Sequence, residues 1–131
     1  MAVTAKAFYN DNVKNAMLAG LTVHGFGVYN PINKVAAKTT SGLGLGSFND
    51  DITWATASGG SVAKSDTPVI NVTAGHTINY LELHWFDTTL TDYVPALVFT
   101  ISAESFPYAG SITITAATLS VSSTILWDSN I

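Results

Sequence analysis

The sequence predicts an all-β protein: a single antiparallel β-sandwich, of jelly-roll or immunoglobulin-like type, with one short N-terminal helix. Helical spacing of apolar residues is confined to the first 20 positions. Beyond residue 20, β-branched and aromatic residues occur in short runs separated by Gly, Pro, Asn, Asp and Ser. The 131 residues are the size of one domain. Residues 1–20 are therefore expected to form a helical segment of the same domain as a sandwich over residues 21–131.

The predicted helix covers Ala5 to Leu18, with Thr4 as its cap and Gly20 as its stop. Four apolar residues three and four positions apart form what we call the apolar stripe: Tyr9, Val13, Ala16 and Met17. A helix this short is unstable alone. The stripe is therefore expected to dock on the sandwich or on a neighbouring molecule.

Seven strands and one weaker strand follow the helix. They are predicted at about Leu21–Tyr29, Ile52–Ala57, Pro68–Val72, Thr77–Asp87, Tyr93–Ile101, Gly110–Thr115 and Thr118–Ile125, with the weaker one at Lys34–Lys38. Alternation within Thr77–Asp87 predicts that Leu81, Leu83 and Trp85 face the core. Glu82 and His84 are then expected on the outer face.

Three connections separate these strands. Thr39–Asp51 is predicted to be a long Gly-rich loop, Ser58–Ser61 a tight or flexible turn, and Asp87–Asp92 a polar turn. Within the loop, Asp50 is expected to form an Asx-type turn before the next strand.

Composition excludes several classes of protein. Only 11% of residues are charged, and the five basic residues are all Lys against nine acidic ones, so a nucleic-acid partner is not expected. No Cys is present, which excludes disulfides and thiolate chemistry. The sequence shows neither the pattern of a secretory signal nor an apolar run long enough to span a membrane, so we expect no membrane partner and folding in a cytoplasm. With 17 Thr and 12 Ser, the outward faces should be rich in hydroxyl groups.

The sequence contains no convincing pattern of phosphate-binding, metal-binding or catalytic residues. The glycines from Gly42 to Gly46 lack the following helix of a phosphate loop. His24, His76 and His84 lie in different segments without metal-ligand spacing, and His84 is expected to be a partly exposed strand residue. A glycosidase needs two opposed carboxylates in a cleft, for which a small sandwich leaves little room. We therefore expect no enzyme activity, no cofactor and no metal, with a calcium site on loop acids as a minor alternative.

Aromatic residues leave one alternative function open. Three Trp and several Tyr residues could form a sugar-stacking platform, as in a carbohydrate-binding module or a host-glycan receptor-binding domain. Core and subunit packing is the favoured interpretation of the same residues. They are Trp54, Trp85, Trp127, Tyr29, Tyr80, Tyr93 and Tyr108.

The order of segments resembles small structural proteins of tailed bacteriophages, in the decoration, head-fibre or tail-fibre-like group. The resemblance rests on five pieces in sequence: Phe8–Met17, Leu21–Tyr29, Ile52–Ser61, Pro68–Ile78 and Tyr108–Val121. It implies a non-enzymatic virion component with a β-sandwich body, and no catalytic residues to carry over. Its expected partners are capsid, connector or tail proteins and other copies of itself.

Low charge independently favours a subunit that is covered by other protein. Leu43, Leu45 and Phe48 of the Gly-rich loop would be exposed in a monomer. Together with the apolar chain end, they predict contacts between subunits, in a trimer or other cyclic homo-oligomer, or against the particle surface. The predicted interface residues are Tyr9, Val13, Met17, Leu43, Leu45, Phe48 and Trp127.

Overall fold

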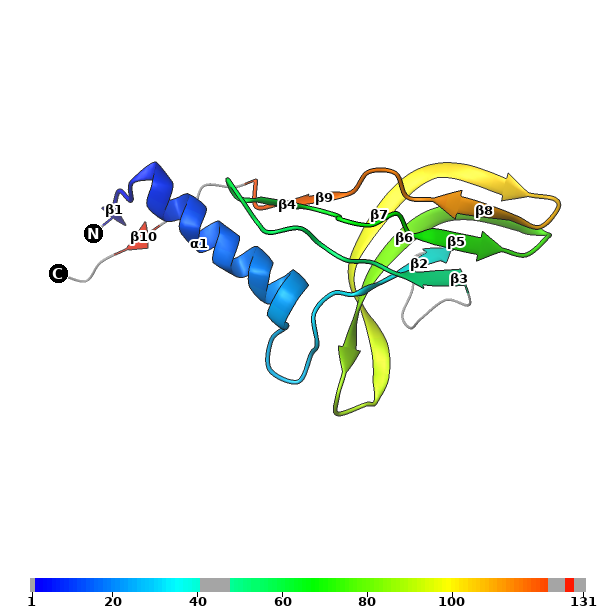
Figure 1. The fold of residues 1–131 in the computed structure, drawn as a ribbon, viewed down its shortest axis with the longest axis horizontal. Coiled ribbons are helices and arrows are strands. Elements are labelled where there is room, and N and C mark those ends of the chain that lie inside the picture. The colour runs from blue at the N-terminus through cyan, green and yellow to red at the C-terminus, as the bar shows by residue number, and fades with distance from the viewer. Residues whose placement is uncertain (1, 41–47, 123–126, 129–131) are drawn as a thin grey trace.

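The structure is a computed structural model that describes residues 2–40, 48–122 and 127–128. It is mostly β, with antiparallel sheets and one N-terminal helix, which confirms the predicted class (Figure 1). No helix in these ranges is both long and apolar enough to cross a membrane.

Helix α1 spans Ala7–Ala19 and continues into a π-helical turn, η1, at Gly20–His24. The predicted cap is wrong, because Lys6 holds the N-cap position and makes no side-chain cap bond. The helix ends at Gly25, whose φ of 74° is one that residues with a Cβ rarely adopt. The strand expected at Leu21–Tyr29 is therefore wrong: residues 21–24 belong to η1, and within the expected range only Tyr29 makes a bridge, to Asp87.

Gly20 does not stop the helix, contrary to prediction. Its φ of −59° and ψ of −44° are helical. The ring of Phe26 lies directly on it, since a Cβ on Gly20 would come within 2.2 Å of Phe26 Cζ. Close approach of this ring is the physical reason that a glycine fits here.

The largest sheet contains four antiparallel strands in the order β3-β2-β6-β7. These strands span Phe48–Asp51 (β3), Lys34–Lys38 (β2), His76–Asp87 (β6) and Asp92–Phe106 (β7). The weaker predicted strand at Lys34–Lys38 is thus confirmed, and it is central. The predicted Gly-rich loop is too long at its end, because residues 48–51 form β3; residues 41–47 lie outside the described ranges.

Three two-stranded sheets complete the pairing. They pair β4 (Ser61–Ala63) with β9 (Thr118–Ser120), β5 (Val69–Val72) with β8 (Gly110–Thr113), and β1 (Ala2–Val3) with β10 (Trp127–Asp128). Because β4–β9 and β5–β8 join the same two chain segments, they form one interrupted ribbon (Figure 1). The predicted strand Ile52–Ala57 is wrong: only Trp54 makes a bridge there, to Lys64.

Both predicted turns that lie in the described ranges are present. Ser58 and Ser61 exchange backbone hydrogen bonds of 2.8 and 3.0 Å, and Gly59 and Gly60 between them both have positive φ. This is the geometry of a two-residue hairpin turn. At the tip of β6–β7, the Asp87 carboxylate accepts hydrogen bonds from the backbone N–H groups of Thr89, at 2.8 Å, and Leu90, at 3.2 Å.

The core lies between the four-stranded sheet and the ribbon, and it extends to the end of α1. Its buried members come from all three: Leu18, Val35, Val62, Ile70, Val72, Ile78, Leu83 and Leu119, with others. Leu81 and Trp85 pack against this cluster together with buried Leu83, which confirms the predicted inward face of β6. A sandwich has two continuous sheets. The described strands instead pair into one four-stranded sheet and separate two-stranded sheets, two of which form the ribbon.

Candidate functional site

The apolar stripe lies on the side of α1 that faces solvent. Tyr9 is 48% exposed and Met17 46% exposed, Ala16 is exposed, and Val13 is half-buried. The opposite side of the helix contacts the β body: Leu18 is its buried residue, and Asn15 Oδ1 accepts a 2.8 Å hydrogen bond from the Gly60 N–H. In the described part of the chain, three of the four stripe residues are thus exposed.

The other predicted interface residues are placed as follows. Leu43 and Leu45 lie outside the described ranges. Phe48 lies in β3, where it is half-buried, packs against the core, and meets the ring of His76 edge-on at 4.9 Å between centroids. Trp127 lies in β10, where its backbone pairs with Val3.

Strand β7 supplies a candidate surface that the sequence did not suggest. It runs for 15 residues and pairs with β6 along one edge, and no strand of the described ranges pairs with its other edge. Leu97 and Val98, at its middle, are 37% and 48% exposed. In the sequence, Pro95 indicates that this strand lies at a sheet edge, because proline in a sheet is confined to edge strands and bulges.

Two apolar hollows lie along the inner side of β7 and share Phe99 and Thr118. One, of about 320 Å³, lies between β7, β2 and the segment after β8, and is lined by residues such as Val35, Leu83 and Ile114. The other, of about 410 Å³, lies between β7, β9 and the end of α1. Its apolar lining consists of Leu18, Leu21, Leu97, Val98, Phe99, Leu119 and Val121. We call these two hollows together the β7 groove.

A charged cluster is buried on the other face of the sheet, where exposed side chains were predicted. Glu82 and His84 are both 0% exposed, and the Nε2 of His84 lies 3.1 Å from Glu82 Oε2. Lys38 Nζ lies 3.7 Å from the same carboxylate oxygen. The expectation of a partly exposed His84 is therefore wrong, because both faces of β6 are covered at this position.

Burial decides the protonation state of His84. Loss of hydration lowers the pKa of His84 below its ordinary value, while the neighbouring Glu82 carboxylate acts in the opposite direction. Neutral imidazole with its proton on Nε2 donates to Glu82, which leaves His84 Nδ1 buried without a hydrogen-bond partner. Because Glu82 and His84 are fully buried, a substrate could not reach them, and we assign this cluster a structural role.

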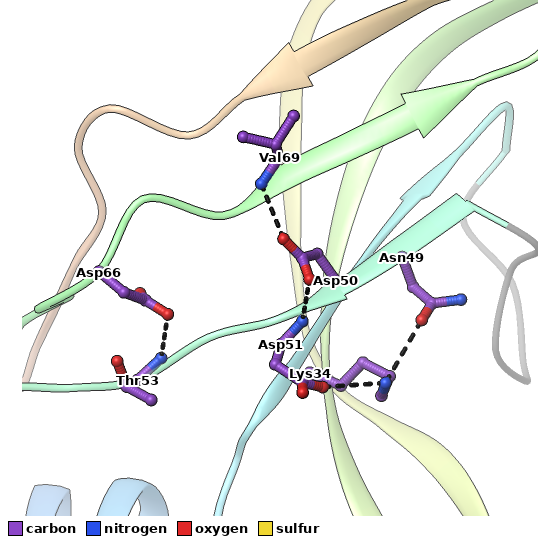
Figure 2. A network of polar contacts seen from close by, with 7 residues as sticks. All are labelled: Lys34, Asn49, Asp50, Asp51, Thr53, Asp66 and Val69. Carbon is purple, nitrogen blue, oxygen red and sulfur yellow. Dashed lines mark hydrogen bonds and ion pairs between the residues drawn. The ribbon is translucent and has the colours of Figure 1, made fainter.

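The acidic residues of β3 and its surroundings hold neighbouring segments together (Figure 2). Asp50 accepts hydrogen bonds from the backbone N–H of Val69 in β5 at 2.8 Å and from that of Asp51 at 2.9 Å. Asp66 accepts from the N–H of Thr53 at 3.1 Å, and Lys34 Nζ lies 3.0 Å from Asp51 Oδ1. Asp50 thus links two strands instead of forming the expected loop turn.

The described part of the chain assembles no metal centre, and three of its aromatic rings pack within the fold. No group of three or more His, Asp or Glu residues there is arranged to hold a metal ion. The indole N–H groups of Trp54 and Trp85 donate to backbone carbonyls, of Ile32 at 2.9 Å and Leu21 at 3.4 Å. Tyr29 packs against Trp85 at 4.9 Å between ring centroids. These aromatic rings contribute to packing.

The chain matches no protein-family model, no curated protein and no solved structure.

Proposed function

We propose that the chain is a non-enzymatic structural subunit of a tailed-bacteriophage particle, a capsid decoration or fibre-like protein that attaches by protein–protein contacts. The observation that carries this proposal is the free edge of β7 beside the β7 groove. An unpaired strand edge presents a row of backbone N–H and C=O groups, which is a template for another strand. The adjoining apolar lining offers burial to that strand's side chains.

Charge supports the same proposal. Residues 92–106 carry Asp92 and Glu104 toward the strand ends and no Lys, so the middle of the edge lacks the charged residues that usually prevent strand addition. We treat the four-stranded sheet and the ribbon as the two layers of one β-sandwich, because the buried core contains residues of both. In this proposal, a strand of another particle protein pairs with the free edge of β7.

Replacing Leu97 with Lys tests the proposal. Leu97 lines the β7 groove and is 37% exposed, so a lysine head group is tolerated in the free chain but is costly once the edge is covered. Leu90→Lys is the matched control, since Leu90 is 65% exposed at the β6–β7 turn. Particles produced with each variant are purified and the chain is quantified by mass spectrometry.

We expect wild type and Leu90→Lys to be incorporated equally and Leu97→Lys to be lost from particles. Leu97→Lys must also retain the wild-type melting temperature, which separates loss of attachment from loss of folding. Absence of the wild-type chain from purified particles would overturn the proposal. A glycan-binding role gains no support from Trp54 and Trp85, whose rings are partly buried and pack against the core.

A further inference from the structure

We propose that an extended segment of another protein, with alternating apolar side chains and a basic residue at each end, inserts between β7 and β9. This inference rests on the proposed function and defines the strand that the free edge of β7 takes. Its first support is the position of the larger hollow of the β7 groove. Leu97, Val98 and Phe99 all line this hollow, although successive residues of a strand point to opposite faces. The hollow therefore lies against the edge of β7.

The opposite wall of the larger hollow belongs to a second strand. It consists of the successive residues 118–121, of which the first three form β9. Within the described part of the chain, β9 pairs with β4 alone. The second hollow continues between the same two segments, where Ile101 of β7 and Ile114 before β9 line it. Across the groove, β7 and β9 therefore face each other without pairing.

The backbone at the middle of β7 points toward the groove. The carbonyl of His84 in β6 accepts a hydrogen bond from the N–H of Asn33, on the β2 side. Backbone groups of alternate strand residues point to the same side, so Glu82 also turns its N–H and C=O toward β2. Val98 is paired with Glu82 and thus turns its own N–H and C=O away from β6. An extended chain satisfies such groups, whereas a lipid tail or a helix offers no backbone partner to them.

The lining of the groove defines which side chains the inserted strand carries. Leu18, Leu83 and Leu119 belong both to the buried core and to the walls of the groove. Every second side chain of an inserted strand points toward them, because strand side chains alternate between faces. Apolar residues at those positions extend the core. The remaining side chains lie beside exposed Val98 and Thr100, where hydroxyl groups keep contact with water.

Charge at the two ends of β7 favours a different protein over a second copy. Asp92 and Glu104 are exposed acidic residues at equal separation from Val98 along the strand. Two copies of β7 paired antiparallel about Val98 would place Asp92 of each copy opposite Glu104 of the other. Like charges directly opposite destabilise a sheet, whereas Lys or Arg at these two positions of a partner strand contributes a favourable pair at each end. The inserted strand is therefore basic at its ends.

Peptide binding to the full chain, measured by fluorescence anisotropy, tests the inference. The probe is a labelled peptide with the length of residues 92–104, alternating Thr and Val residues, and a Lys at each end. One matched peptide carries Glu at both ends. Another is N-methylated at every Val, which removes N–H donors and keeps the side chains. We expect the probe to bind, the Glu-ended peptide to bind at least about tenfold more weakly, and the N-methylated peptide not to bind.

Two variants of the chain locate the bound peptide. Val98→Pro removes the N–H that faces the groove, whereas Val98→Thr keeps this N–H on another β-branched residue. We expect Val98→Thr to bind the probe like wild type and Val98→Pro to bind it at least about tenfold more weakly. Melting curves establish that both variants fold. If Val98→Pro does not fold, the N-methylated peptide tests the same hydrogen bonds on the wild-type chain.

Failure of the probe to bind the wild-type chain overturns the inference, as does equal binding of the N-methylated or the Glu-ended peptide. A wild-type oligomer that the probe dissociates would assign the groove to a second copy and would also overturn it. The particle experiment with Leu97→Lys is read separately. Its failure rejects attachment to a particle. Loss of Leu97→Lys from particles without any peptide binding keeps attachment through this surface and rejects insertion of a strand.

Discussion

At the scale of single residues, the buried Glu82 carboxylate of β6 is expected to have a large effect on stability. Glu82 is held between Lys38 and His84, and all of its exposed surface is lost on folding. Removing one partner of a buried ion pair is costly, since it leaves the other group buried and unpaired. The Lys38 side chain keeps 15% exposure, so its head group can regain some water.

We predict that Glu82→Ala lowers the free energy of unfolding by about 3 kcal/mol, the lower end of the range for broken buried pairs. Urea denaturation monitored by fluorescence measures this loss. Glu104→Ala is the matched control: Glu104 is exposed on β7, and the change should be within about 0.5 kcal/mol. Equal effects of the two substitutions would contradict the structural role of the cluster.

This cluster also marks where sequence reasoning failed at the residue scale. Alternation correctly placed Leu81, Leu83 and Trp85 toward the core. The same alternation implied a solvated opposite face for Glu82 and His84, because polar residues on alternate positions usually face water. Ion pairing with Lys38, which is remote in sequence, makes burial of the opposite face possible, and no local pattern reveals that pairing.

At the scale of elements, attachment of α1 to the β body depends on a short contact with the Ser58–Ser61 turn. Gly60 is buried, and its N–H donates to Asn15 Oδ1. Without this acceptor a buried donor is left unsatisfied, which costs about 1–3 kcal/mol.

We therefore predict that Asn15→Ala destabilises the chain by about 1 kcal/mol or more relative to Asn12→Ala. Asn12 is exposed on the same helix, and both substitutions gain the same helix propensity from alanine. The difference between their melting curves, recorded at one protein concentration, isolates the bond to Gly60. No difference would mean that the bond from Gly60 to Asn15 does not help to hold α1 to the β body.

Most elements could be predicted because their local signals agree with their packing. The helix and the strands near Lys34–Lys38, Pro68–Val72 and Thr77–Asp87 follow from periodicity and turn residues. The predicted strand at Leu21–Tyr29 fails because Gly20 accommodates the ring of Phe26 rather than ending the helix. Ile52–Ala57 fails because burial of an apolar segment does not require ladder pairing: Ile52 is buried, yet only Trp54 makes a bridge.

For the molecule as a whole, stability should depend on pH through His84. Its pKa is lowered in the folded chain because burial disfavours the imidazolium form, so below the ordinary value of 6.5 the unfolded chain binds protons more readily. Stability is then fully present above pH 6.5 and is lost as the pH falls toward the folded pKa. Nearby Glu82 and Asp92 favour the proton and Lys38 opposes it.

We predict that the free energy of unfolding decreases between pH 7 and pH 5, and that His84→Gln reduces this decrease. A glutamine amide can still donate to Glu82 but does not titrate. His24→Gln, at an exposed position on η1, is the control and should keep the wild-type slope. Urea midpoints at a series of pH values measure the slope, and an unchanged slope in His84→Gln would assign the pH dependence to other groups.

The pairing of distant segments also bears on how quickly the chain reaches this structure. Ser61 of β4 lies opposite Ser120 of β9, and Lys34 of β2 lies opposite His84 of β6. Ladders between segments so far apart in sequence require large loops to close first, which places folding on the millisecond-to-second scale typical of β proteins. Among the described strands, the β6–β7 hairpin, closed by the Asp87–Asp92 turn, joins two successive strands over the longest stretch. We therefore expect this hairpin to form early in folding, before the ribbon and α1 assemble on it.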